Sequence, residues 1–206
     1  MSLFGRADDP VPPPPVPADA APRPDPDGAV LGAVVLAAFR RQMGAQRRTA
    51  EVALAQLPDG AFDRPLGALD PPGVQVKHLA GSLRSRFTDF LTTDGEKDDR
   101  DRDTEFTLAR GDTREALMDG WNNAWDTVDA TLASLTPGDL DRTVTIRGEP
   151  FAVVDALARA LGHASYHTGQ IVALAKHAAG DAWQTVSIPR GGSVAYTRDV
   201  RARHGA

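Results

Sequence analysis

Two histidines, His163 and His167, have the type and spacing that most clearly indicate chemistry. They lie four residues apart in the middle of a long helical pattern, so they share one face and are about 6 Å apart along the helix axis. The same face continues through apolar residues, namely Ala156, Ala160, Ile171 and Leu174. We therefore expect both imidazoles to point inward, where their nitrogens are costly to bury unless a partner satisfies them. One divalent cation would satisfy both, so the pair indicates a metal site.

A third histidine, His78, lies beside the apolar stripe of an earlier helical pattern. The small residues Gly81-Ser82 follow one turn later and leave room for a ligand or solvent near the bundle axis. If the two helices are neighbours, His78 completes a three-histidine site with open positions, as in catalytic rather than structural metal sites. His177 is ten residues past His167, about 15 Å along the helix, and is too far away to join. The alternative is that these are core or surface histidines with ordinary hydrogen bonds.

The composition and the known motifs exclude several other kinds of chemistry. The chain of 206 residues has no cysteine, so it has no disulfide, thiolate zinc site, iron–sulfur cluster or cysteine nucleophile, and any thiol must come from a small molecule. It contains no P-loop, no glycine-rich dinucleotide motif and no serine-hydrolase elbow. Ala164 stands where a zinc-protease helix has its glutamate base, and no histidine follows the Glu-x-x-His pattern of di-iron proteins. The net charge of -5 argues against bulk attraction to nucleic acid.

Four long helical patterns would position the histidines, each bounded by proline, glycine or capping residues. They are expected at residues 30–57, 71–93, 112–136 and 149–180. Asp112 is the expected cap of the third helix, and Glu149-Pro150 is the expected start of the fourth. A short β-prone piece, Thr143–Ile146, precedes it. The predicted fold is all-α, a four-helix bundle.

Residues 1–27 form a compositional block of their own, with nine of the 16 prolines between Pro10 and Pro26. We expect a disordered or polyproline-like tail there, and the bundle domain at 28–206, in which residues 181–206 have an irregular pattern. The start of the chain lacks a signal-peptide pattern, and the longest apolar stretch, Ala29–Phe39, is shorter than the ~20 residues that a bilayer requires. A cytoplasmic protein without a membrane or nucleic-acid partner is the expectation.

Two segments resemble a known family. Lys77-His78-Leu79-Ala80-Gly81 and the later run HASYHTGQ, which begins at His163, are similar to the DinB/YfiT-like metalloenzymes of the DinB superfamily. The resemblance spans residues 29 to about 193. It implies a four-helix bundle of DinB/YfiT type with one divalent ion, zinc, nickel, iron or manganese, bound by His78, His163 and His167. Many members have an arginine directly after the last ligand, where this chain has Thr168, so a role of that arginine does not carry over.

The resemblance also implies a function, since thiol S-transferases occur in this family. Three neutral histidines would leave the ion able to lower the pKa of a bound thiol or water by several units. The expected protein is a metal-dependent enzyme that activates a low-molecular-weight thiol, with a bound water or thiolate as the reacting group. A metal-dependent hydrolase and a non-catalytic, stress-associated metal-binding bundle are the alternatives. A fourth protein ligand would favour the last of these, with Glu96 and Asp103 as candidates.

Several arginines could hold an acidic substrate or a thiol cofactor at the mouth of the site. They are Arg84, Arg86, Arg100, Arg102 and Arg190. Arg190, in a Pro-Arg-Gly-Gly turn after the last helix, is the candidate cofactor-binding residue, and a salt bridge that pins the terminus is its alternative role. The expected partner is a small-molecule substrate, and a homodimer is compatible with the sequence.

Overall fold

The computed structural model describes residues 26–205, and this part of the chain is mostly helical, as the sequence predicts. The predicted disordered tail, residues 1–27, lies outside the described residues except for its last two, which begin the first helix. Among the described helices, none combines the length and apolar character needed to cross a membrane.

Five α-helices, three short 3-10 helices and two strands follow one another along the described chain. The α-helices are α1 (Pro26–Leu54), α2 (Pro72–Phe87), α3 (Arg114–Ser134), α4 (Val153–Ala179) and α5 (Ser193–His204). The 3-10 helices are η1 (Asp103–Phe106), η2 (Pro137–Asp139) and η3 (Gly180–Ala182). The strands β1 (Thr143–Ile146) and β2 (Glu149–Ala152) form one antiparallel hairpin.

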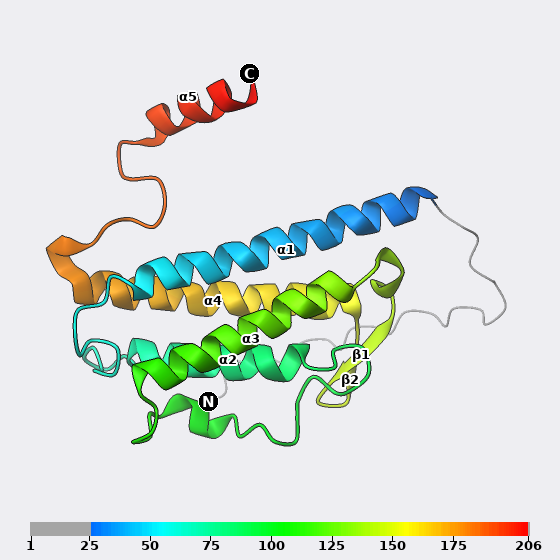
Figure 1. The fold of residues 1–206 in the computed structure, drawn as a ribbon, viewed down its shortest axis with the longest axis horizontal. Coiled ribbons are helices and arrows are strands. Elements are labelled where there is room, and N and C mark those ends of the chain that lie inside the picture. Colours follow the sequence, from blue (N-terminus) through cyan, green and yellow to red (C-terminus); the bar gives the residue numbers. More distant parts are fainter. Residues whose placement is uncertain (1–25, 206) are drawn as a thin grey trace, which may run out of the picture.

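The first four α-helices pack together (Figure 1). Helix α2 contacts both α3 and α4, while α1 lies mainly along α4 and the η2 turn. The connector between α2 and α3 returns to α2 through η1. Helices α2 and α4, which contain His78, His163 and His167, are therefore neighbours, as the predicted site requires.

The core between these helices is mainly apolar. Trp121 and Trp125 of α3 are fully buried and lie edge to face, with ring centroids 5.6 Å apart. They belong to one cluster with Met43 of α1 and Leu79 of α2. Burial of large apolar side chains is the main favourable term in folding, so this cluster holds α2 against its neighbours.

The start of α4 differs from the prediction. Residues Glu149–Ala152 form β2, and the helix begins only at Val153. Arg147 and Gly148 connect the two strands, and both have positive φ angles, 58° and 76°, as tight two-residue hairpin turns require. Pro150 lies within β2, an edge strand in which its missing N–H is tolerated. The proline that indicated a helix start therefore belongs to a hairpin.

Two further predictions of local structure are wrong. Thr113, not Asp112, caps α3, because its side chain accepts a hydrogen bond from the backbone N–H of Ala116. Asp112 instead pairs with Lys77 of α2 at 2.8 Å. The C-terminal segment, predicted to be irregular, contains α5, which has no buried residue, ends at the left-handed Gly205 and lies apart from the packed helices (Figure 1).

Candidate metal centre

The three predicted ligands converge between α2 and α4. His78 extends from α2, and His163 and His167 extend from successive turns of α4. The Nε2 atom of His163 lies 3.3 Å from Nε2 of His78 and 3.1 Å from Nε2 of His167. One ring nitrogen from each histidine lies within 4.8 Å of the others. The three residues are therefore close enough together to hold one metal ion.

The separations between these nitrogens match those of metal ligands. Zinc binds an imidazole nitrogen at about 2.0–2.1 Å, so tetrahedral angles place two such nitrogens roughly 3.3 Å apart. The two measured distances, 3.1 and 3.3 Å, are close to this spacing. Nε2 of His163 therefore lies at about the spacing of two ligands of one ion from both His78 and His167, and one ring nitrogen from each of the three histidines lies within 4.8 Å of the others.

The second ring nitrogen of His78 and of His167 has its own partner. His78 Nδ1 lies 2.8 Å from Oε2 of Glu105. His167 Nδ1 lies 2.8 Å from Oε1 of Gln75. Both oxygens accept, so each Nδ1 carries the proton and each Nε2 has a bare lone pair. Because Nε2 of His163 has at most one proton to donate, the three Nε2 atoms cannot all be satisfied by one another, whereas a cation would satisfy all of them.

The two α4 histidines of the cluster, His163 and His167, are neutral near pH 7. Burial, followed by the charges of His167 and His78, lowers the pKa of His163 to about 4. Burial and then the charge of His78 also lower the pKa of His167 to about 4. Neutral imidazole is the form that binds a metal, so these two ligands need not lose a proton first.

Glu105 of η1 is the main site residue that the sequence analysis missed. Its carboxylate is buried, accepts the Nδ1 proton of His78, and accepts two hydrogen bonds of 2.8 Å from Arg100. Burial opposes its ionisation, but the hydrogen bonds from Arg100 and His78 outweigh burial and hold the pKa of Glu105 below its ordinary value. A Cβ at Gly81 would overlap this carboxylate. The room predicted beside Gly81 is therefore occupied by Glu105 rather than by a ligand.

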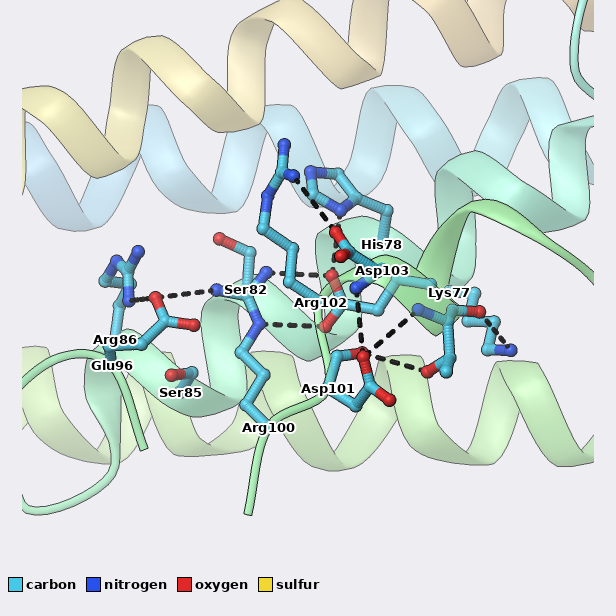
Figure 2. A network of polar contacts seen from close by, with 12 residues as sticks. Lys77, His78, Ser82, Ser85, Arg86, Glu96, Arg100, Asp101, Arg102 and Asp103 are labelled. Atoms are coloured by element: carbon cyan, nitrogen blue, oxygen red, sulfur yellow. Dashed lines mark hydrogen bonds and ion pairs between the residues drawn. The ribbon is translucent and has the colours of Figure 1, made fainter. Parts of the chain in front are cut away.

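A second carboxylate, Glu96, organises arginines near the histidines. Figure 2 shows it between Arg86 and Arg100, and its Oε2 atom lies 2.8 Å from the first and 3.4 Å from the second. The same oxygen lies 3.1 Å from Arg147 of the hairpin turn. Glu96, one of the two predicted fourth ligands, therefore pairs with arginines rather than with the histidine cluster. The side chain of Asp103, the other predicted fourth ligand, is 96% exposed. Among the described residues, the candidate ligand cluster contains only the three histidines.

A cavity of about 320 Å³ lies beside the cluster. His78 and His163 are on its wall, together with Ser82, whose hydroxyl oxygen is 3.4 Å from Nδ1 of His163. Among the described residues, the wall contains no carboxylate, but it contains five arginines, namely Arg86, Arg100, Arg102, Arg147 and Arg159. The open side of the cluster therefore faces a small cavity with a strongly cationic wall.

Three of the five arginines predicted at the mouth of the site line this cavity, namely Arg86, Arg100 and Arg102. Arg84 instead pairs with Asp99 at 2.8 Å and is not on the wall. Arg190 is exposed in the turn before α5 and is also absent from the wall. Two further arginines of the wall, Arg147 and Arg159, are not among those predicted from the sequence, and they reach the cavity from the hairpin turn and from α4.

A model of the family described as "Protein of unknown function (DUF1572)" matches residues 31–192. The match covers most of α1 and all of α2, α3 and α4, and it includes the three histidines and Glu105. It ends one residue before α5. Neither the curated proteins nor the solved structures yield a match.

Proposed function

The chain belongs to the DUF1572 family, and we propose that it is a metal-dependent enzyme, a thiol S-transferase that activates a low-molecular-weight thiol at its three-histidine site. The observation that carries this proposal is the open side of the cluster. Two of the three histidines line a cavity, and no fourth protein ligand is present among the described residues. Structural zinc sites are normally closed by four protein ligands, whereas catalytic sites keep a position open. The arrangement therefore favours a reactive centre.

The chain's own residues would hold the ion and set its ligand geometry. Neutral imidazoles supply the ligands, while Glu105 and Gln75 fix the ring orientations of His78 and His167. The negative charge of Glu105 next to His78 also makes the Nε2 atom of this imidazole a stronger electron-pair donor to a metal. A divalent ion held there would lower the pKa of a bound thiol, so that the thiolate forms near neutral pH.

The thiol must come from a second molecule, because the chain has no cysteine. A cavity of about 320 Å³ is large enough for a small ligand. Its described wall has no carboxylate that could serve as a general base toward water. These features support thiol transfer over the competing function, hydrolysis of an ester or amide.

The resemblance to the DinB/YfiT-like metalloenzymes supports the same proposal, and with it a DinB-type four-helix bundle. The proposed ligands lie on α2 and α4, two neighbours among four packed helices. Thr168 replaces the arginine that many members have after the last ligand. It is buried, and its hydroxyl has no hydrogen-bond partner among the described residues, so this position offers no positive charge to a substrate.

Cobalt substitution tests the proposal, since a thiolate bound to Co²⁺ gives a charge-transfer band that bound water does not. Titration of the cobalt-loaded chain with several small thiols should produce this band for at least one of them. The His167→Ala variant should lose the band, while His177→Ala, which removes an exposed histidine of the same helix, should keep it. Persistence of the band in His167→Ala would contradict the site.

Two other outcomes would reassign the function. If no thiol perturbs the cobalt spectrum but an ester analogue does, hydrolysis replaces thiol transfer. If neither ligand reaches the metal, the non-catalytic binding protein becomes the better assignment. Metal analysis of protein purified without a nickel affinity step would identify the ion among zinc, nickel, iron and manganese.

A further inference from the structure

The cavity beside the histidines has a wall whose charge selects its ligand. From this wall we infer that the substrate of the site carries at least two negative charges, as carboxylate or phosphate groups, and that the arginines hold them. This deepens the proposed function, on which the assignment of the ligand as a substrate rests. The binding of the anion itself rests only on the residues of the cavity.

The charge balance of the cavity is the first argument. Five guanidinium groups line it, and two carboxylates lie behind them. Glu96 is shared by Arg86, Arg100 and Arg147, and Glu105 also pairs with Arg100. Five positive charges against these two carboxylates leave an excess of three, which the exposed Asp103 beside Arg102 compensates only weakly, and a divalent ion would add two more. A neutral or singly charged ligand would leave most of this excess uncompensated.

Two of the arginines lack a buried acidic partner and are therefore available to a ligand. Arg102 lies 3.8 Å from Asp103, whose side chain is almost fully exposed, and such surface pairs contribute little. Arg159 has no carboxylate partner among the described residues. Both guanidinium groups lie over aromatic rings, 4.7 Å from the ring centroid of Phe106 and 5.6 Å from that of Phe151. These contacts restrain the groups but leave their N–H donors free for a carboxylate or phosphate.

Arg86 and Arg100 form a fixed part of the wall. Arg100 is almost completely buried, with a side chain only 3% exposed. Its guanidinium is held by Glu105 and by Glu96, the latter labelled beside it in Figure 2. Arg86 is held by Glu96 and by the backbone carbonyl of Gly95. Groups that are already ordered lose little entropy when a ligand arrives, which strengthens binding. The fixed wall would set the local potential, while Arg102 and Arg159 would contact the anionic groups directly.

The position of the cavity links this charge to the histidines. His78 and His163 share its wall with the arginines, so an anion held by the guanidinium groups lies next to the open side of the cluster. In about 320 Å³ there is room for a compact molecule of this kind. Guanidinium groups bind carboxylates and phosphates through paired hydrogen bonds, which would orient the uncharged end of the substrate toward the metal position.

Calorimetry with simple anions tests the inference. The full chain, with metal removed by chelation and with one equivalent of zinc, would be titrated with succinate, inorganic phosphate, acetate and neutral succinamide. Succinate or phosphate should bind at one site per chain, with acetate at least about tenfold weaker and succinamide undetectable. Preference between succinate and phosphate then distinguishes a carboxylate from a phosphate substrate.

Variants assign the binding to the cavity. Arg102→Gln and Arg159→Gln should each weaken the preferred anion about tenfold, because each removes a charged hydrogen-bond donor. Arg84→Gln, which removes an arginine outside the cavity, should change the affinity less than about twofold. Equal binding of succinate and acetate, or binding unaffected by both cavity variants, would overturn the inference. Two mixed outcomes separate this inference from the proposed function. If anions bind but no thiol gives a band on cobalt, only the proposed function is contradicted. If a thiol gives the band but no anion binds, only this inference is contradicted.

Discussion

The two sides of the helical core are built from different kinds of residue. On the apolar side, formed by α1 and α3, every buried side chain among the described residues is apolar, and Trp121 and Trp125 are the largest. On the polar side, made of α2, η1 and α4, seven buried residues are polar or charged: Gln75, His78, Ser82, Ser85, Glu105, His167 and Thr168. The buried polar and charged residues of the described chain are thus confined to α2, η1 and α4, although α2 and α4 also contribute apolar side chains to the core.

This division shows how a small helical protein can stay folded although its site contains buried polar groups that destabilise the fold. A buried polar group destabilises the fold unless it finds a partner, and the facing Nε2 atoms of the histidines are not all satisfied by protein groups. The apolar side contains one comparable group, the buried Nε1 of Trp125, which has no hydrogen-bond partner among the described residues, and it otherwise supplies hydrophobic stabilisation. Changes on the polar side should therefore alter ligand binding first, and changes on the apolar side should alter stability first.

Removal of the polar side's ligands should have the largest effect. In the His163→Ala/His167→Ala variant only His78 remains, so metal affinity should fall by more than about a hundredfold, beyond the usual effect of losing an outer hydrogen bond. Without metal, its melting temperature should fall by only a few degrees, because the main losses are two polar contacts, that of Gln75 with His167 and that of His78 with His163. Elemental analysis and thermal unfolding with a chelator measure both. Full stoichiometric metal in this variant would contradict the site.

Loss of one large side chain on the apolar side should have the opposite signature. Trp121→Ala should lower the free energy of unfolding of the metal-free chain by about 3–5 kcal/mol, because it empties a fully buried position. The fraction that remains folded should bind metal with unchanged affinity. Chemical denaturation gives the first quantity and metal titration the second. A large loss of metal affinity at unchanged stability would show that the two sides are not separable.

A smaller effect on metal affinity should follow from the outer partner of His78. Glu105→Gln removes the charge that orients this imidazole, so affinity should fall by about 10–100-fold while the three ligands stay in place. Competition with a chromophoric chelator measures the change. An unchanged affinity would mean that Glu105 serves only to neutralise Arg100.

Two glycines offer a matched comparison for the same contact. Gly81→Ala places a Cβ where the Glu105 carboxylate lies, so it should reduce metal affinity in the same direction as Glu105→Gln. Gly120→Ala on α3 meets no neighbouring atom and should instead stabilise the helix by about 0.5–1 kcal/mol without an effect on metal. If the two variants change metal affinity and stability equally, the polar and apolar sides of the core are not functionally distinct.

The parts of this site that lie on one helix are the parts that the sequence predicts. His163 and His167 follow from a spacing of four, which local helix geometry converts directly into a shared face. His78 follows from its place on a second helical pattern, and its meeting with the other two requires only that α2 and α4 are neighbours.

The rest of the site depends on contacts that local patterns do not encode. Glu105 is one acidic residue among several in a charged connector, and only the return of η1 to α2 selects it. The one available signal is Gly81 on an otherwise buried stripe, which marks a close approach of some other group. Arg147 likewise reaches the cavity because Arg147 and Gly148 form a hairpin turn. The sequence does not predict this turn, because Pro150, taken alone, indicates the start of a helix rather than a strand.

A modest pH effect is expected at the edge of the apolar side, where η2 packs against α1. Hydrogen bonds from Thr136 and then Arg142 lower the pKa of Asp139 from 3.8 to about 2. A lowered pKa means that the carboxylate stabilises the fold above pH 3.8 and that this contribution is lost as the pH falls toward about 2. Asp139→Asn should therefore be less stable than the parent by about 1 kcal/mol near neutral pH, with the difference vanishing by about pH 2. Thermal unfolding across this range measures it, and a difference that grows on acidification would refute the assignment.

The smallest effect is expected from α5, which belongs to neither side. None of its residues is buried, and the family match ends one residue before it. A chain that ends at Gly192 loses no core contact, so its melting temperature should change by less than about 2 °C and its metal affinity should not change.

Thermal unfolding at two protein concentrations is the decisive measurement, because a helix with exposed Val194 and Tyr196 could be covered by a second copy of the chain. If truncation lowers the melting temperature and removes a concentration dependence present in the full chain, α5 is a dimer contact and the polar and apolar sides no longer account for all of the stability. If both chains unfold alike at both concentrations, the two sides of the helical core suffice.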